Sequence, residues 1–385
     1  MGQLEGDNIG APPNGADIDG RPPAIFKSTP EDFVVDEIPA YAASGKGEHL
    51  FVHFRKRDLT THEAVRRIAQ ALDVDQRGTG VAGQKDKVGV TTQTVSFPFP
   101  IVRGDADAAA LSLDGIEIIA IKRHDHKLKP GHLVGNRFRV TLRGLDEAVA
   151  TALSPRLIEA ARTGVPNAYG PQRYGRDGDN PERALAWLAG RERGPRDKRD
   201  QRFLFSALQS HLFDRVLAER VAAGTHLTVL AGDLAKKSET GGMFLVPEDP
   251  TELAEAQGRA DRLELSATGP MFGASMRWPE GAPAEIERRV LSEGFGDESR
   301  LKQLAHLGEG TRRVVRLVPT EFVTFRVEGG LGVGFVLPKG GYATTFLGAV
   351  CRLQEDRGTA GGAEAHEASP ESAAGESTAT WSTAT

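Results

Sequence analysis

The chain has 385 residues, of which 39% are hydrophobic and 26% charged, as expected for a globular protein large enough for two domains. The single cysteine, Cys351, excludes a disulfide framework and a cysteine-rich metal site. No apolar run is long enough to span a membrane. The amino terminus lacks the basic start and apolar core of a signal peptide, so we expect a cytoplasmic protein.

The formal net charge of −5 is unevenly distributed. Four acids and one Arg lie in 1–22, and six acids and one Arg in 355–385, which leaves +3 for 23–354. Both terminal segments are predicted to be disordered, because they contain little that could be buried. Lys and Arg cluster in three segments of the body, 122–143, 191–202 and 312–316. Such clusters could follow a phosphate backbone or form solvated surface.

Strand and helix patterns mix irregularly in the first part of the chain. Runs of β-branched and aromatic residues predict strands at 32–38, 49–57, 90–99, 116–124 and 137–143. Apolar spacing predicts a helix over 60–72, capped by Thr61, and another over 146–162 that is interrupted at Pro155. This mixture predicts an α+β fold.

The pattern changes over the glycine-rich segment 163–180. Helices are predicted at 202–221 and near 284–292, and strand patterns return at 320–328 and 331–338. The return of strands predicts that the middle of the chain is an insertion and that the last strands complete the first sheet.

The segment AGQKDKVGVTTQT places Asp86 between Lys85 and Lys87 in a glycine-flanked turn. Neighbouring cations favour the ionised carboxylate, which is a poor general acid. An ionised Asp can act as nucleophile, electrostatic stabiliser, metal ligand or helix cap. Local chemistry alone favours a solvated turn.

The basic segment 123–140 contains His124, His126 and His132, which suggests zinc only weakly because cysteine partners and a standard ligand spacing are missing. Asn136 and Phe138 stand two residues apart, so they share one face of a strand. An amide and an aromatic ring facing one way could bond and stack a base. The alternative is an edge polar residue beside a core phenylalanine.

Two glycine-rich motifs hold further candidates. The motif PNAYGPQRYG contains Tyr169, Gln172 and Arg173 and could contact RNA, form a hinge, or do both. The motif GGLGVGFVLPKGGYATT contains Phe335, which could line a site or belong to the core. Its GLGVG is no dinucleotide fingerprint, because no helix opens after it.

Six motifs in this order resemble those of the TruD family of tRNA pseudouridine synthases and together span residues 27–347. They are KSTPEDFVVDEI (27–38), AGQKDKVGVTTQ (82–93), RHDHKLKPGHLVGNRFRVTLR (123–143), GVPNAYGPQRYG (164–175), FLFSALQSHLFDRVLAER (203–220) and FVLPKGGYATTFL (335–347).

The resemblance implies a pseudouridine synthase fold: a central, mostly antiparallel sheet in two halves, with flanking helices. It also implies an inserted α/β TRUD domain. The expected boundaries are 23–164 for the first part of the catalytic domain, 165–318 for the insertion and 319–354 for the C-terminal strands.

The implied activity is isomerisation of uridine 13 of tRNA to pseudouridine, without cofactor or metal. Asp86 matches the family's nucleophile, which would attack either C6 of the base or C1′ of the ribose. Lys85 or Lys27 would keep it ionised. The alternatives are a non-catalytic RNA-binding or RNA-folding protein on this scaffold, and a synthase acting on another RNA site.

Substrate contacts carry over in the same way. Phe138 resembles the aromatic residue that stacks on the target base, Phe335 a second wall, and Asn136 a residue that bonds the nucleotide or supports the loop. The expected partner is tRNA, with no membrane and no obligate protein partner. The residues expected to contact RNA are Lys127, Lys129, Arg137, Tyr169, Gln172 and Arg173.

Overall fold

The computed structural model describes residues 20–104, 111–175 and 177–355. The segments predicted to be disordered, 1–22 and 355–385, lie outside these ranges except for residues 20–22 and Glu355. Glu355 ends a strand, so the predicted start of the tail is wrong by that residue. The described residues form two compact units, one of 20–170 with 316–355 and one of 171–315. The insertion boundaries 165–318 remain a prediction.

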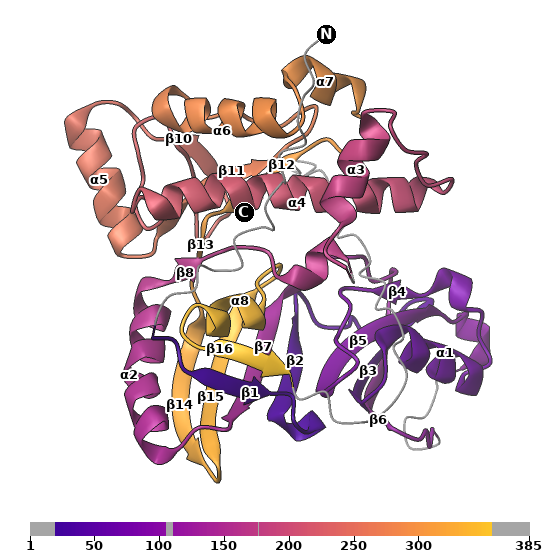
Figure 1. Ribbon diagram of the computed structural model, residues 1–385. Coiled ribbons are helices and arrows are strands. Elements are labelled where there is room, and N and C mark those ends of the chain that lie inside the picture. Colours follow the sequence, from indigo (N-terminus) through magenta and orange to yellow (C-terminus); the bar gives the residue numbers. More distant parts are fainter. Residues whose placement is uncertain (1–19, 105–110, 176, 356–385) are drawn as a thin grey trace, which may run out of the picture. The chain divides into compact units, whose positions relative to one another are not determined.

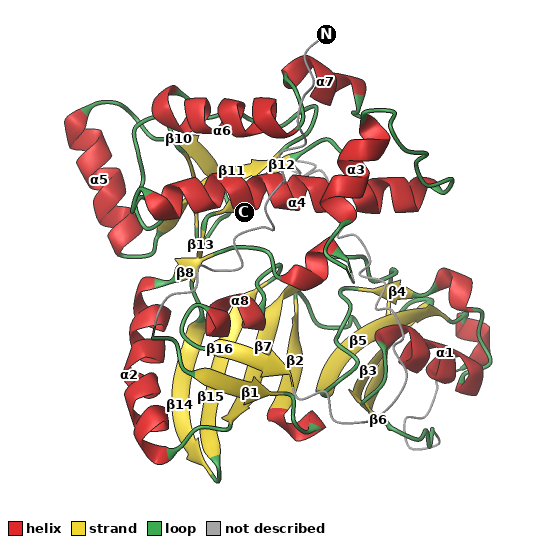
Figure 2. Ribbon diagram, viewed as in Figure 1, coloured by secondary structure: helices red, strands yellow, loops and turns green. Residues whose placement is uncertain are grey.

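A ten-stranded sheet organises the first unit (Figures 1 and 2). Seven strands follow one another in the order β14-β15-β7-β2-β5-β3-β6, while β1 pairs with β7 and β16, and β4 pairs with β5. The strands are β1 (Pro23–Phe26), β2 (Phe33–Pro39), β3 (His49–Arg57), β4 (Gly80–Val81), β5 (Val90–Pro98), β6 (Ile116–His124), β7 (Leu133–Arg143), β14 (Thr320–Val327), β15 (Gly330–Pro338) and β16 (Arg352–Glu355).

The sheet is mostly antiparallel and divides into two halves where β2 meets β5. These two strands run parallel and pair over only three positions, from Val34 opposite Val90 to Asp36 opposite Thr92. In contrast, β15 pairs with β7 along its whole length. The C-terminal strands therefore complete the first half of the sheet, as their sequence pattern predicts, and the expected α+β fold is confirmed.

Three helices cover one face of this sheet: α1 (Thr61–Ala71), α2 (Glu147–Thr163) and α8 (Ala343–Gly348). Helix α1 buries Ile68 against Val52 and Phe54 of β3. Helices α2 and α8 share a second core with alternate residues of β7 and β15, including Val140 and Val333. Because strand side chains alternate between faces, the residues in between point to the opposite face.

Three local predictions need correction. The hydroxyl of Thr60, not Thr61, caps α1 by accepting from the amide of Glu63 at 3.1 Å. Helix α2 continues through Pro155. The proline has no N–H to donate to the carbonyl of Thr151. Both residues are exposed, so water can bond to that carbonyl instead. Strand β7 begins at Leu133, before the predicted residue 137.

The second unit combines helices with a small antiparallel sheet in the order β10-β9-β11-β12. Its longest helix, α4 (Lys198–Ala222), buries Leu208 and Leu212 in a core shared with Phe272 and Val290. The other elements are α3 (Asn180–Leu188), α5 (Pro250–Asp261), α6 (Gly281–Gly294), α7 (Glu298–Gln303), β9 (Leu234–Lys237), β10 (Met243–Leu245), β11 (Leu265–Met271) and β12 (Thr311–Val314). Two short strands of the first unit, β8 (Val165–Pro166) and β13 (Arg316–Leu317), pair with each other. Among the helices of the described ranges, none is both long and apolar enough to cross a bilayer.

Candidate active site

Asp86 lies in the loop between β4 and β5, where its carboxylate meets a buried cation. Nζ of Lys27 donates to Oδ2 of Asp86 at 2.8 Å. The Lys27 side chain is only 8% exposed, whereas the Asp86 side chain is 44% exposed. The arrangement therefore presents an accessible carboxylate over a buried ammonium group, which favours its ionised form.

Lys27 reaches this position through an unusual backbone conformation. Its φ of 60° lies in the left-handed region, which is uncommon for residues other than glycine. Its ammonium group lies 4.5 Å from the ring centre of Phe33 and 5.2 Å from that of Phe26. Cation–π attraction and the ion pair with Asp86 thus compensate the backbone strain, and strain of this kind clusters at functional sites.

Lys85, adjacent to Asp86 in sequence, has a different partner. Its Nζ donates to Oε2 of Glu37 at 2.6 Å, and both side chains are buried. Its backbone amide donates to Oγ1 of Thr61 at 2.9 Å. Of the two lysines expected beside Asp86, Lys27 contacts the carboxylate and Lys85 anchors the loop.

A third lysine, which the sequence motifs did not single out, holds the main chain of the same residue. Nζ of Lys56, on β3, donates to the backbone carbonyl of Asp86 at 2.6 Å. Lys56 is fully buried, and this burial lowers its pKa to about 8, against an opposing effect of the negative charges of Asp86 and Asp58.

Lys56 and Glu37 share a sequence signal that could have revealed them. Both are charged residues on the face of a strand that points into the core. Lys56 stands two positions after the buried Phe54, and Glu37 stands two positions after the buried Val35. Buried charges are usually paired, so a charge at an inward position of a strand predicts a partner in the interior.

Gly89 closes the loop against β2. Its φ is +135°, and a Cβ added there would lie 2.5 Å from the carbonyl oxygen of Phe33. A side chain at this position would push the loop away from β2, so glycine lets the segment carrying Asp86 approach Phe33 closely.

The expected base-binding residues lie beside this site but are largely buried. The rings of Phe138 and Phe335 stack with centroids 5.3 Å apart and are 7% and 1% exposed. Phe138 also packs at 6.1 Å from Phe33, which contacts Lys27. Asn136 pairs with Glu37 in the sheet register, and its buried Oδ1 has no hydrogen-bond partner among the described residues. Both rings also belong to the hydrophobic core, and base stacking remains a prediction.

Four of the six residues expected to contact RNA belong to the first unit. Lys127 and Lys129 are exposed between β6 and β7. Arg137 points to the other face of the sheet from Phe138 and pairs with Glu321 at 2.7 Å. The ring of Tyr169 lies 6.1 Å from that of Tyr342.

The remaining two belong to the second unit. The guanidinium of Arg173 donates to the hydroxyls of Ser206 and Ser210 on α4, at 3.1 Å for Ser210. The side chain of Gln172 lies outside the described part of the structure. Arg173 thus has a structural role in joining a short 3-10 turn (Pro171–Tyr174) to α4.

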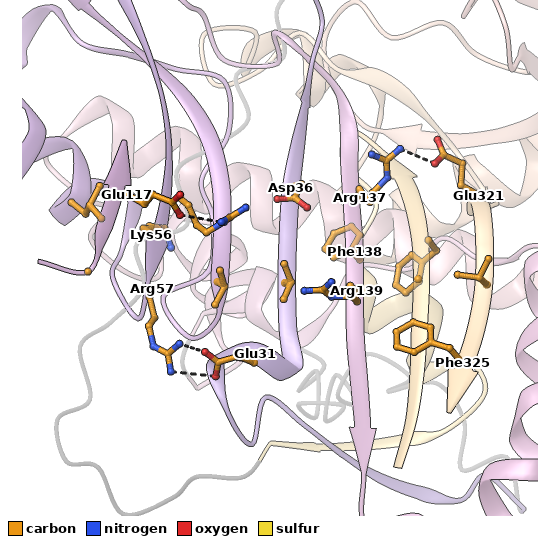
Figure 3. A pocket seen from close by; sticks show the side chains of 18 of the residues that line it. Glu31, Asp36, Lys56, Arg57, Glu117, Arg137, Phe138, Arg139, Glu321 and Phe325 are labelled. Atoms are coloured by element: carbon orange, nitrogen blue, oxygen red, sulfur yellow. Dashed lines mark hydrogen bonds and ion pairs between the residues drawn. The ribbon is translucent and has the colours of Figure 1, made fainter. Parts of the chain in front are cut away.

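A hollow of about 870 Å³ lies on the sheet face opposite the helices and does not include Asp86 (Figure 3). Figure 3 shows Asp36, Arg137 and Arg139 projecting from neighbouring strands, with Arg57 paired to Glu31. Its lining holds five basic and four acidic side chains, so the hollow lacks the strongly cationic character that suits RNA phosphates. We therefore place the candidate site at Asp86.

The three histidines of the basic segment belong to an aromatic cluster. The ring centroids of His124 and His126 lie 4.4 Å apart, and the hydroxyl of Tyr41 is 2.6 Å from Nδ1 of His132. Burial, followed by the nearby positive charges, lowers the pKa of His124 and His132. Within the described ranges, no three His, Cys, Asp or Glu side chains are grouped to hold a metal ion.

Comparison with solved structures first defines the fold class. The fold is similar to that of a putative tRNA pseudouridine synthase D from Methanosarcina mazei, with a TM-score of 0.65 and 24% identity over 86% of this chain and 94% of that one.

Sequence comparison then identifies the family. The family model described as tRNA pseudouridine synthase D (TruD) matches residues 18–182 and 197–350. The tRNA pseudouridine synthase D of Anaeromyxobacter sp. (strain Fw109-5) is 42% identical over 84% of this chain and 90% of that protein. A tRNA pseudouridine synthase D of Thermus thermophilus is 41% identical over 84% of this chain and 88% of that protein. The chain belongs to the tRNA pseudouridine synthase D (TruD) family.

Proposed function

We propose that this protein isomerises uridine 13 of tRNA to pseudouridine, with Asp86 as the nucleophile. The observation that carries the proposal is the accessible Asp86 carboxylate, paired with the buried Lys27, in a chain of the TruD family. A carboxylate kept ionised and partly exposed suits nucleophilic attack and would be a poor proton donor. Such a reaction belongs in the cytoplasm with its tRNA substrate.

The isomerisation conserves every atom of the substrate. In one route the Asp86 carboxylate attacks C1′, the N1–C1′ bond breaks, and uracil leaves as an anion. The base rotates, C5 bonds to C1′, and the carboxylate is released; C5 then loses its proton and N1 gains one. In the other route the carboxylate first adds to C6 of the base. Lys27 would stabilise the carboxylate before attack and after release.

The target nucleotide must leave the RNA stack, which costs on the order of a few kcal/mol. Stacking on an aromatic ring would return about 1–3 kcal/mol per base. We assign this contact to Phe138, with Phe335 behind it, and a hydrogen bond to the nucleotide to the unused Oδ1 of Asn136. The exposed Lys127 and Lys129 would bind phosphates of the tRNA.

Mapping pseudouridine in RNA from cells with and without this protein tests the proposal. We expect pseudouridine to disappear at position 13 of tRNA and nowhere else. Loss at a different position would assign the enzyme another RNA site. Unchanged pseudouridine at every position would favour the non-catalytic alternative, an RNA-binding or RNA-folding protein.

The Asp86→Asn variant tests the nucleophile. It keeps the size of the side chain but removes its charge, so we expect no detectable product from a purified enzyme that still binds a tRNA transcript. Asp73→Asn is a matched control, because the Asp73 side chain follows α1, is 99% exposed and lies outside the proposed chemistry. Near-normal turnover by Asp86→Asn would disprove the assignment.

A further inference from the structure

Two buried ammonium groups hold the backbone around Asp86 from the two halves of the sheet. Glu37 of β2, in the first half, binds Nζ of Lys85 at 2.6 Å. Lys56 of β3, in the second half, binds the carbonyl of Asp86 at 2.6 Å. The halves themselves meet over only three residue pairs of β2 and β5, so these contacts fix the loop where the two halves of the sheet are joined.

We propose that Lys56 is a positioning residue of the reaction, which holds the Asp86 backbone and supports the Asp86 carboxylate electrostatically from beneath. The inference rests on the proposed function of Asp86. Lys27 would orient the carboxylate through a direct contact, while Lys56 would act through the main chain and through its charge.

Packing alone does not explain a lysine at this position. Lys56 is fully buried at the same strand phase as the apolar Val52 and Phe54, which pack under α1. An unpaired buried ammonium is strongly unfavourable, and an apolar side chain would avoid that cost. Among the described residues, the hydrogen bond of Lys56 is to the Asp86 carbonyl, so its charge is directed at the loop.

The groups around Lys56 make its charge sensitive to pH. Burial lowers its pKa to about 8, the carboxylates of Asp86 and Asp58 oppose this effect, and the cation of Lys85 adds to it. Lys85 is itself balanced by Glu37. Lys56 is therefore mostly charged at neutral pH and loses its charge in mildly alkaline solution, where Asp86 would lose this support.

Single-turnover formation of pseudouridine on a tRNA transcript, followed between about pH 6.5 and 9.5, tests the role. We expect Lys56→Met to lower the rate at saturating enzyme by about 10-fold or more at neutral pH. The enzyme concentration that gives half the maximal rate should change by less than about twofold. The wild type should lose activity above about pH 8, and this alkaline decline should be absent in Lys56→Met.

Arg55→Met is the matched control, because Arg55 is the preceding residue of β3, points to the opposite face and pairs with Glu117 at 3.0 Å. We expect it to keep the rate and the pH profile of the wild type. A Lys56→Met rate within about twofold of wild type would overturn the proposal, as would an unchanged alkaline decline. A higher enzyme concentration for half the maximal rate, with the maximal rate itself unchanged, would also overturn it.

Hydrogen exchange of the full-length protein separates this inference from the proposed function. Without RNA, amides of residues 82–89 should exchange faster in Lys56→Met than in Arg55→Met, and equal exchange would overturn the positioning role.

If the wild type forms no pseudouridine, the proposed function fails while the exchange result still decides whether Lys56 holds the loop. If Lys56→Met does not fold, Lys56→Arg replaces it. In the wild type, protection of the loop amides relative to their intrinsic exchange rates should fall above about pH 8, and a permanently charged side chain should remove this change. A persistent change in Lys56→Arg would contradict the proposal.

Discussion

Nζ of Lys27 lies 2.8 Å from Oδ2 of Asp86, although 59 positions separate the two residues in the chain. The ammonium group lies against the rings of Phe26 and Phe33, and the Lys27 side chain is only 8% exposed, so little water screens the pair from the side of the lysine. Charge interactions strengthen where water is excluded. The pair is thus both the most direct constraint on the Asp86 carboxylate and the first target for mutation.

Lys27→Met should reduce pseudouridine formation by about 100-fold, a typical loss when one preorganised electrostatic contact is removed. The substitution keeps a long side chain between the two rings but removes the cation. The measurement is the single-turnover rate on a tRNA transcript. Lys46→Met, at an exposed position of the same unit, is the control and should keep the wild-type rate. Wild-type turnover by Lys27→Met would show that Asp86 needs no direct cation.

The buried pair of Glu37 and Lys85 should contribute to stability in a strongly coupled way. Glu37→Gln leaves the Lys85 ammonium unpaired in the interior, so we expect the free energy of unfolding to fall by about 3 kcal/mol. Adding Lys85→Met should restore part of that loss, because the uncompensated charge is then removed. Urea unfolding of the two single variants and the double variant gives the coupling.

The exposed pair of Glu159 and Arg162 on α2 provides a comparison for that cycle. Their atoms are as close, at 2.7 Å, but both side chains are mostly exposed, so no measurable coupling is expected. Additive effects of Glu37→Gln and Lys85→Met would show that the two groups do not depend on each other for their charge.

Much of the fold follows from local sequence patterns. Strands β3 and β6 match their predicted ranges, because alternation and turn residues define them without help from distant segments. Local patterns fail where a distant residue determines the hydrogen bonds of a side chain. The Thr61 hydroxyl donates to Gln93 and accepts from the amide of Lys85 instead of capping the helix. The parallel pairing of β2 with β5 likewise depends on segments far apart in the chain.

The site shows the same division. The motif around Asp86, and the six motifs that follow the order found in the TruD family, direct attention to Asp86, Lys27 and Lys85. Neither indicates that Lys85 turns to Glu37 or that Lys56 reaches the Asp86 carbonyl, because both contacts require the strands to be assembled. Residues that act through the backbone of another residue carry no motif of their own.

The stack of Phe138 on Phe335 should contribute mainly to the core. Phe335 is 1% exposed and packs between Phe138 and Phe346, with ring centroids at 5.3 and 5.1 Å. Phe335→Ala would leave a cavity and lower the free energy of unfolding by about 3–5 kcal/mol, which denaturant unfolding would measure. Phe325→Ala is a control from the neighbouring strand, where the ring is 37% exposed and the loss should be smaller. Unchanged stability with lost activity in Phe335→Ala would instead place that ring against the substrate.

The histidines of the aromatic cluster, together with His49, which pairs with His124 in the sheet, should make the fold less stable in mild acid. Burial, followed by the charges of His126 and nearby lysines, lowers the pKa of His49, His124 and His132 below the ordinary value of 6.5, while Glu48 and Asp125 partly oppose the shift. The unfolded chain therefore binds protons at these histidines before the folded one does. Their contribution is fully present above about pH 6.5 and is lost as the pH falls from there through the lowered folded values. Urea unfolding at several pH values should show this decline.

His124→Gln should make that decline shallower, because it removes one of the titrating groups while the new carbonyl oxygen can still accept from the amide of Ser44, as Nδ1 does at 3.1 Å. His306→Gln removes an exposed histidine from the second unit and should leave the wild-type dependence on pH. A decline that is equally steep in His124→Gln and in the wild type would mean that acid destabilises the protein through other groups. These are paired carboxylates, which must be protonated as the pH falls, or buried histidines elsewhere, such as His211, whose pKa burial lowers to about 4.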